Sequence, residues 1–521
     1  MKIKNKPIKK NIFISLIIFS FIIFQGCLSD TYNDINITKK DILTCAFFIP
    51  ESIFPYDITV ENQNTIKPNI YNSLVEFDEV FQIVPGLAES WNNPNNLTWR
   101  FNLRKDVKFH NGNNFTSEDV KFTLEKIFVS YSAFIKEVNI IDNYSIDIIT
   151  YEPYPGLLQR IALSFVVFSK KYMENIIDSE NYWPIGTGAY KLVEYQENNY
   201  VKLERFDDYW RKKPEIKTVI FKIIIDADER VAELINGTID IIDYNVDKKI
   251  NDILKEENVK IVKYPPLSTY IIGFDLRVNN SYGFADNNNP TSDVRVRKAI
   301  YHAIDIEPLI EGPFMGFAQP ASQFLTPYIF GYNSEIKRLE YNITEAKELL
   351  NESGYGDGFN ITLDCITEGF DYNIENCQLI SDQLSKIGIN MSVNGMAMDE
   401  FNKKVVFEKN TSLWLVGWGT ISVDGGYVYN NFIKSYNNSD GYYNSGHYSN
   451  IIVDKLGEKA SIEMDPSERV KYLKDGFKIA IVDDVIIVPL FSQELFSLTS
   501  NNVYLPPRAD LKILLEDIYF H

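Results

Sequence analysis

Cysteine is scarce in this sequence, with four residues among 521. Cys27 directly follows an apolar N-terminal segment. The other three, Cys45, Cys365 and Cys377, are an odd number, which rules out a complete disulfide framework. Cys365 lies in a strand-like segment and Cys377 on the predicted helix after it. A bridge between these two and a pair of buried free thiols are therefore alternatives.

Basic residues are also few, because 52 Lys and Arg stand against 71 Asp and Glu and give a net charge of −19. Removal of residues 1–26, which contain five Lys and no acidic residue, would change this charge to −19 − 5 = −24. We do not expect a chain this acidic to bind nucleic acid, since phosphate binding requires a basic surface.

The short motifs of common enzyme classes are missing, including G-x-S-x-G, H-E-x-x-H and a Gly-rich phosphate loop. Neither His110 nor His302 has a second His or Cys at a metal spacing such as i, i+4. We therefore predict a protein that is not an enzyme and holds no cofactor. A secreted hydrolase that uses a carboxylate pair stays an alternative, because the separation of scattered Asp and Glu is not visible in a sequence.

Long apolar runs are absent after the N-terminus, where no stretch reaches the roughly 18 residues of a membrane-spanning helix. At the N-terminus, five lysines precede an apolar block from Ile12 to Phe24. This block would cover about 20 Å as a helix, short of the roughly 30 Å hydrocarbon layer, and is typical of a secretory signal.

The segment Phe24-Gln25-Gly26-Cys27 resembles the lipobox of secreted lipoproteins, in which the Cys is acylated and becomes the new N-terminus. We accordingly expect a signal peptide over 1–26, a lipidated Cys27, and a polar tether over 27–36. An ordinary signal peptide, or an uncleaved anchor with an incidental Cys, is the alternative. Each version places the rest of the chain outside the cytoplasm.

Hydrophobic periodicity indicates an α/β protein with at least two mixed sheets. Apolar and polar residues alternate in segments 99–103 and 107–109, which predicts two half-buried strands. Thr116 is the expected cap of the next helix, with Asp119 as its capping-box partner. Residues 219–243 predict a βαβ unit, and a similar succession of helices and strands follows at 344–396.

Seven stretches of the chain, in order, resemble the family 5 extracellular solute-binding proteins of ATP-driven importers, which include oligopeptide-, dipeptide- and nickel-binding members. They are VPGLAESW (84–91), LTWRFNLRKDVKFHNGNNFTSEDVKFTLEKI (97–127), PIGTGAYKLVEY (184–195), LERFDDYW (203–210), DVRVRKAIYHAID (293–305), AKELLNESGYGDGF (346–359) and GHYSNIIVDKL (446–456). They span nearly the whole mature chain.

The resemblance implies a periplasmic-binding-protein-like fold of two lobes (cluster C type) with an additional third domain and hinge-linked mixed sheets. Lobe 1 would comprise residues 37–75, 185–265 and 488–521, the extra domain 76–184, and lobe 2 266–487. The two hinges would lie near Tyr264-Pro265-Pro266 and near Val488-Pro489, where prolines limit the bend to a few torsions.

The resemblance also implies a function. We expect a monomeric, lipid-anchored protein on the outer face of the cell membrane that captures a peptide or similar small solute by hinge closure. It would deliver this ligand to an ABC permease in the membrane. Capture of nickel or another metal chelate is the alternative within the same fold.

The first group of candidate ligand-binding residues follows the apolar run at 413–417. In the family, the Trp418-Gly419 pair lies in the cleft, and a Trp suits a pocket wall, although a core position is the alternative. Peptide-binding relatives hold the amino terminus of the ligand with an Asp three residues after this Trp, and here that residue is Ile421. Asp424 matches a second family carboxylate that begins the next helix, so a cap competes with a binding role. Tyr427 completes the group.

Two further groups come from segments near the expected cleft. Thr269 and Tyr270, just after the first hinge, would add a ring and a backbone edge with which an extended peptide could pair. Phe54, Tyr56 and Asp57 belong to the loop after the first strand, which contributes side chains to the cleft in the family.

His447 is the candidate metal ligand, because nickel-binding relatives place a His on a loop after the Trp-Gly pair. The arginines with which those relatives hold the carboxylates of a metal chelator have no clear counterpart in this sequence. We therefore predict no metal site and expect His447 to be a solvent-exposed loop residue.

Overall fold

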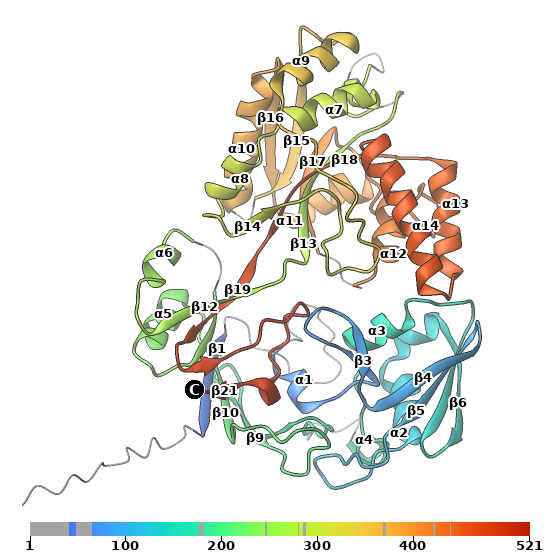
Figure 1. Ribbon diagram of the computed structural model, residues 1–521, viewed down its shortest axis with the longest axis vertical. Helices are drawn as coiled ribbons and strands as arrows, with labels where there is room; N and C mark the ends of the chain where they lie inside the picture. Colours follow the sequence, from blue (N-terminus) through green and yellow to red (C-terminus); the bar gives the residue numbers. More distant parts are fainter. Residues whose placement is uncertain are drawn as a thin grey trace, which may run out of the picture. The chain divides into compact units, whose positions relative to one another are not determined.

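The computed structural model (Figure 1) describes residues 41–47, 65–176, 182–244, 247–279, 281–284, 288–367, 371–419, 423–437 and 439–521. The predicted signal peptide, Cys27 and the tether lie outside the described residues. The same holds for the loop candidates Phe54, Tyr56 and Asp57.

Within the described residues, seven strands form a mixed sheet in the order β12-β19-β11-β1-β10-β9-β8. These strands are β1 (Ile42–Phe47), β8 (Tyr190–Gln196), β9 (Tyr200–Arg205), β10 (Thr218–Ile223), β11 (Ile241–Tyr244), β12 (Val259–Tyr264) and β19 (Leu495–Ser500). Strand β1 lies between β10 and β11 and runs parallel to both. The predicted βαβ unit is confirmed, since α5 (Ala227–Ile235) connects β10 to β11 and the chain turns at Gly237 with a φ of 74°.

A second mixed sheet has the order β14-β18-β13-β17-β15-β16 in the described part of the chain. Its strands are β13 (Ser268–Phe274), β14 (Ala318–Pro320), β15 (Phe359–Ile366), β16 (Ile389–Met396), β17 (Leu413–Gly419) and β18 (Ile487–Gln493). At the top of Figure 1 this sheet is accompanied by α7 (Val294–Ala303), α8 (Glu307–Glu311), α9 (Ile343–Glu352) and α10 (Asp371–Ser385). The two mixed sheets confirm the predicted α/β class.

An antiparallel sheet of order β4-β5-β7-β6 follows the first strand. It contains β4 (Ala88–Asn95), β5 (Thr98–Leu103), β6 (Ile135–Asp142) and β7 (Ser145–Thr150), next to α2 (Ser117–Phe122), α3 (Leu157–Ser164) and α4 (Lys170–Ile176). The strand predicted at 99–103 and the capping box are confirmed, because Thr116 N–H donates to Asp119 Oδ2 over 2.9 Å. The strand predicted at 107–109 is wrong. Val107 and Phe109 are buried, but this tight hairpin makes a single bridge, between Lys108 and Asn114.

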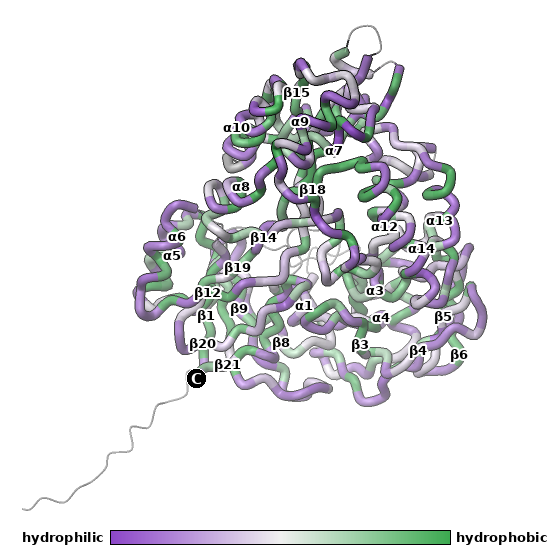
Figure 2. The backbone as a smooth tube through the Cα atoms, turned by 45° about the horizontal axis from the view of Figure 1, so that its top comes forward, coloured by the Kyte–Doolittle hydropathy of each residue, from purple (hydrophilic) through white to green (hydrophobic). Residues whose placement is uncertain are grey.

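The remaining β-strands and α-helices of the described residues lie outside these three sheets. The strands pair as β2 (Val75–Phe77) with β3 (Ile83–Pro85) and β20 (Val503–Tyr504) with β21 (Tyr519–Phe520), and the helices are α1 (Lys67–Ile70), α6 (Ile250–Ile253), α11 (Met398–Phe401), α12 (Gly425–Val428), α13 (Ile451–Ile462) and α14 (Pro466–Lys478). Figure 2 shows hydrophilic residues along the segment around α6 and longer hydrophobic stretches in the sheets. Over the described ranges, no helix combines the length and the apolar character that a membrane crossing requires.

The chain passes twice between the two large sheets, and we call residues 265–267 and residue Glu494 the inter-sheet passages. The first lies where a hinge was expected. The second differs from the expectation, because Val488 and Pro489 lie inside β18, within the second sheet. Pro489 is tolerated there since it pairs opposite Ile271, where the register of β13 and β18 shifts and the hydrogen-bond ladder is interrupted.

Cys45, Cys365 and Cys377 are free and buried. Cys365 on β15 and Cys377 on α10 are hydrogen-bonded to each other, which lowers the pKa of the Cys365 thiol. Of the two alternatives left by the sequence, the pair of buried free thiols is the one observed.

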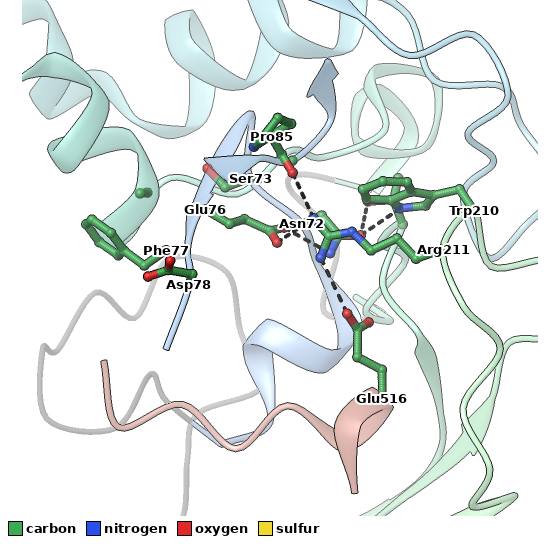
Figure 3. A network of polar contacts seen from close by, with 12 residues as sticks. Asn72, Ser73, Glu76, Phe77, Asp78, Pro85, Trp210, Arg211 and Glu516 are labelled. Carbon is green, nitrogen blue, oxygen red and sulfur yellow. Dashed lines mark hydrogen bonds and ion pairs between the residues drawn. The ribbon is translucent and has the colours of Figure 1, made fainter. Parts of the chain in front are cut away.

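Arg211 connects three segments that are separate in sequence (Figure 3). Two of them contain Glu76 and Pro85, and the third contains Glu516, close to the C-terminus. The guanidinium of Arg211 lies 2.7 Å from Glu76 Oε2 and 3.4 Å from Glu516 Oε1, and it donates to the Pro85 carbonyl over 3.2 Å. It also stacks on Trp210, at 4.4 Å from the ring centre. Burial raises the pKa of Glu516, and the charge of Arg211 opposes this shift. Arg211 therefore compensates two carboxylates that are mostly removed from water.

We expect Arg211→Met to lower the free energy of unfolding by about 3 kcal/mol, because Glu76 and Glu516 would remain enclosed without a cation. Lys213→Met is the matched control, since Lys213 pairs with Asp207 on the surface and should contribute less than about 1 kcal/mol. Chemical denaturation of both variants measures the difference. Equal, small losses would contradict the structural role of Arg211.

His110 is partly buried, and two backbone groups select its neutral form. Nε2 lies 3.0 Å from the Gly188 carbonyl, and the Gly186 N–H donates to Nδ1 over 3.3 Å. Only the tautomer with its proton on Nε2 satisfies both contacts, because a proton on Nδ1 would face the N–H of Gly186. Burial is the main cause that lowers the pKa of His110 from 6.5 to about 4.

This lowered pKa predicts a loss of stability in weak acid. Above pH 6.5 the imidazole is neutral in the folded and in the unfolded protein. Between pH 6.5 and 4 the unfolded chain binds a proton at His110 that the folded protein does not bind, so the free energy of unfolding decreases as the pH falls. The shift corresponds to about 3 kcal/mol at full effect. We expect His110→Gln to reduce the dependence of unfolding free energy on pH over this range, as measured by urea denaturation at several pH values. Parallel profiles for both proteins would refute the assignment.

Candidate functional site

The pairing of β17 positions Trp418 near the first inter-sheet passage. Strand β17 runs antiparallel to β13, so that Trp418 lies opposite Thr269, and Gly419 lies opposite Ser268, the first residue after the passage. Trp414 earlier in the strand is 6% exposed and belongs to the core, whereas Trp418 is only partly buried.

Two aromatic residues from the chain after β17 contact Trp418. Its ring centre lies 4.4 Å from that of Phe432, in an edge-to-face arrangement, and 4.8 Å from that of Tyr443. Phe432 and Tyr443 stack on each other at 5.2 Å. These geometries are favourable for aromatic pairs and hold the indole in one orientation.

These rings belong to a cavity of about 260 Å³, which we call the Trp418 pocket. It is lined by Tyr270, Ile366, Asn373, Met398, Phe401, Asn402, Val405, Val406, Trp414, Leu415, Val416, Gly417, Trp418, Phe432, Tyr443 and Ser445. Among the described residues that form this wall there is no Asp, Glu, Lys, Arg or His. The pocket is therefore apolar, with a few neutral polar groups, as is common for sites that bind small organic molecules.

Two side-chain polar atoms of residues in this wall are buried and have no hydrogen-bond partner among the described residues. Asn373, which is 6% exposed, donates from Nδ2 to the Ile366 carbonyl over 2.7 Å, and its Oδ1 accepts no hydrogen bond. Trp418 Nε1 donates none. Asn373 was not predicted from the sequence, because it lies on α10, far from the Trp-Gly motif along the chain.

Thr269 and Tyr270 differ from their expected role. Strand β13 is flanked by β17 on one side and β18 on the other, so its backbone offers no edge to a peptide. Thr269 is fully buried, with its hydroxyl 3.1 Å from that of Ser492. Tyr270 does add a ring to the Trp418 pocket, and it lies so close to Gly417 that a Cβ there would approach the ring to 2.8 Å.

Asp424 is a helix cap and an ion-pair partner. Its Oδ1 accepts from Gly426 N–H at the start of α12, over 2.7 Å, so the cap that competed with a binding role is present. Both carboxylate oxygens also accept from the Arg469 guanidinium, at 2.7 and 2.8 Å, and both side chains are buried. Sequence reasoning missed Arg469, which lies 45 residues away on α14.

A second cavity, of about 550 Å³, lies between the Asp424 region and residues 133–160; we call it the Tyr427 cavity. Tyr427, Asp424 and Arg469 line one side, and Tyr154 and Arg160 belong to the other. Trp418 and Tyr427 therefore line different cavities, and Gly419 lines neither of them.

His447 is not the solvent-exposed residue that we expected. It is partly buried, in a left-handed backbone conformation with a φ of 56°, and burial followed by the charge of Arg277 lowers its pKa. Within the part of the chain that the structure describes, no group of three His, Cys, Asp or Glu side chains is placed to hold a metal ion.

The fold and the sequence match known proteins. The family described as bacterial extracellular solute-binding proteins, family 5 Middle, matches residues 82–440. The dipeptide-binding protein of Escherichia coli (strain K12) is 25% identical over 420 residues, 74% of this chain and 76% of that protein. The nickel-binding protein NikA of Staphylococcus aureus (strain NCTC 8325 / PS 47) is 26% identical over 480 residues, 90% of this chain and 91% of that protein.

Solved structures confirm the predicted periplasmic-binding-protein-like fold. The unliganded open form of the periplasmic murein tripeptide-binding protein MppA has a TM-score of 0.81 at 20% identity, covering 92% of this chain and 97% of that chain. DppA of Helicobacter pylori in complex with the peptide STSA has a TM-score of 0.66 at 23% identity, covering 92% and 98%. The names of these relatives describe binding proteins. The family match covers more than half of this chain, and the chain therefore belongs to the bacterial extracellular solute-binding proteins of family 5.

Proposed function

We propose that this protein is a lipid-anchored receptor on the outer face of the cell membrane. It captures a peptide or a similar small organic solute by closure of two lobes and delivers it to an ABC permease. The observation that carries this proposal is the Trp418 pocket, an uncharged aromatic cavity next to an inter-sheet passage. Cys27 carries the lipid in this proposal, and the protein acts as a monomer.

Two chain passages at one place support closure about a hinge. The last residue of β12, Tyr264, pairs with the first residue of β19, Leu495, so the passages at 265–267 and Glu494 are neighbours. The carboxylate of Glu494 contacts one residue from each large sheet. It lies 2.8 Å from Nζ of Lys263, in β12 of the first sheet, and accepts a hydrogen bond from Nε2 of Gln319, in β14 of the second, over 2.7 Å. Rotation there would move the second sheet relative to the first with few torsions changed. In this proposal lobe 2 extends to Gln493.

The lining of the Trp418 pocket favours an organic side chain over a metal chelate. Aromatic and aliphatic groups form its wall, and His447 is not among them. Asp424 already accepts two hydrogen bonds from the buried guanidinium of Arg469. An ammonium group of a ligand would have to displace this cation in order to pair with the Asp424 carboxylate, which is unfavourable. Capture of a nickel chelate, as the name of the Staphylococcus aureus relative suggests, is the competing function.

Thermal unfolding with two sets of probes separates these functions. We expect a pool of tri- and tetrapeptides to raise the melting temperature, since a ligand at 100 times its dissociation constant stabilises the folded state by about 2.7 kcal/mol. Nickel with free L-histidine should have no effect. A rise with nickel and histidine alone would overturn peptide capture.

The binding peptide should also decrease the radius of gyration of the protein in solution scattering, because the two lobes would close on it. An unchanged radius of gyration would overturn hinge closure.

We expect Trp418→Ala to weaken binding of that peptide about tenfold or more, because a partly buried aromatic wall is lost from the pocket. Its melting temperature should stay close to that of the unmodified protein. Trp414→Ala on the same strand is a comparison for stability only, since Trp414 also lines the pocket; it should cost about 3–5 kcal/mol of stability because this residue is buried. If calorimetry finds unchanged affinity for Trp418→Ala, the pocket assignment is wrong.

A further inference from the structure

One buried lysine, Lys409, contacts the backbone on both sides of Tyr443, a residue of the Trp418 pocket. We propose that Lys409 is a positioning residue for ligand capture, because its ammonium group holds the Tyr443 ring in place before a peptide enters the pocket. This inference rests on the proposed function. Lys409 does not itself line the pocket, so its effect on binding would pass through Tyr443.

The ammonium group of Lys409 donates to the two carbonyls that flank Tyr443. Its Nζ lies 3.0 Å from the carbonyl oxygen of Tyr442 and 3.2 Å from that of Asn444. It also lies 4.9 Å from the centre of the Tyr436 ring, which is a cation–π distance. An ammonium group has three protons, and two carbonyls and a ring are enough to engage all of them.

Tyr443 connects the aromatic residues of the pocket with the segment that Lys409 holds. Its ring contacts Trp418 and stacks on Phe432. Its N–H donates to the carbonyl of Asn431, the residue before Phe432, over 2.9 Å. Its carbonyl accepts from the N–H of Ser445, which also lines the pocket, over 2.8 Å. The backbone around Tyr443 therefore determines where this part of the wall lies.

Lys409 comes from a different wall of the pocket. It follows the helical segment η6 (Asn402–Phe407), three residues of which line the pocket. The Arg277 guanidinium donates to the Lys409 carbonyl over 3.3 Å, which holds the backbone from which the lysine side chain extends. Lys409 therefore connects the η6 wall to the wall that contains Tyr443.

The conformation and the burial of Lys409 are both unfavourable for a lysine. Its φ of 52° lies in the left-handed region, which favours Gly or Asn. The residue is 7% exposed, and burial lowers the pKa of its ammonium group from 10.5 to about 8. Within the described ranges, this ammonium contacts carbonyls and a ring and not a carboxylate. An uncharged side chain would cost less to bury, so the stability of the fold does not account for a cation at this position.

Calorimetric titration of Lys409→Met tests the positioning role. The probe is the tri- or tetrapeptide of the pool described above that raises the melting temperature of the unmodified protein most. Methionine keeps an unbranched side chain but removes the charge and the donors. We expect the affinity to fall about fivefold, because the peptide would then have to order Tyr443 as it binds.

Lys403→Met is the matched control for this titration. Lys403 is an exposed lysine of η6 that does not line the pocket, so its replacement should leave the affinity unchanged. An unchanged affinity in a folded Lys409→Met protein, even one with a lower melting temperature, would show a purely structural role and overturn the inference.

A double-mutant cycle with Tyr443→Ala tests whether Lys409 acts through Tyr443. In the Tyr443→Ala protein, the further change Lys409→Met should not weaken binding again, because the ring that Lys409 positions is already absent. The same fivefold loss in both backgrounds, about 0.9–1 kcal/mol in each, would mean that the two residues act independently and would overturn the inference.

A crystal structure of the unmodified protein with the same peptide decides the question if Lys409→Met does not fold. It should show Nζ of Lys409 within hydrogen-bond distance of both carbonyls and the Tyr443 ring in contact with the peptide. The loss of either feature would overturn the inference while peptide capture stands. If no member of the peptide pool binds, the proposed function fails, and the inference fails with it.

Discussion

Strands β12 and β19 pair with each other up to Tyr264 and Leu495, the residues at which the chain enters or leaves the first large sheet. This pairing brings two passages together that are more than 200 residues apart in sequence. In the second sheet the passages continue into β13 and β18, which are again neighbours. Since β17 is the other neighbour of β13, the end of β17 and Trp418 lie beside the passages. Backbone hydrogen bonding at one point thus determines where the candidate site forms.

The distribution of charge in this region follows from the cost of burial. The chain carries a net charge of −19, yet its buried carboxylates in the second sheet and its surroundings are compensated by cations of the same protein. Asp275 pairs with Arg277, Asp364 with Lys404, and Asp424 with Arg469. A buried charge without a partner is unfavourable, which explains why each of these three buried carboxylates has a cation beside it. None of the six residues lines the Trp418 pocket. Under the proposed function, the specificity of this pocket would arise from its shape and from contacts with its rings.

Local sequence signals predicted much of the fold. Alternation in 99–103, the capping box at Thr116 and the succession of helices and strands at 344–396 can all be read from patterns within short segments, and all are observed. The failures have a different origin. Residues 107–109 alternate because their apolar side chains are buried by neighbouring elements, without a partner strand. Pro489 resembled a hinge residue, but an irregularity in the pairing with β13 accommodates it inside a strand.

The sequence by itself determined the family, the α/β class and the residue types at the candidate site, because these depend on motifs and on hydrophobic periodicity along the chain. Only the tertiary structure decided which side chains meet. It placed Asn373 with Trp418 in one pocket, moved Tyr427 to another, and paired Asp424 with Arg469. It also enclosed Thr269 between two strands. The reason is that cavities and ion pairs arise from contacts between residues distant in sequence, and no local pattern records which distant segments will pack together.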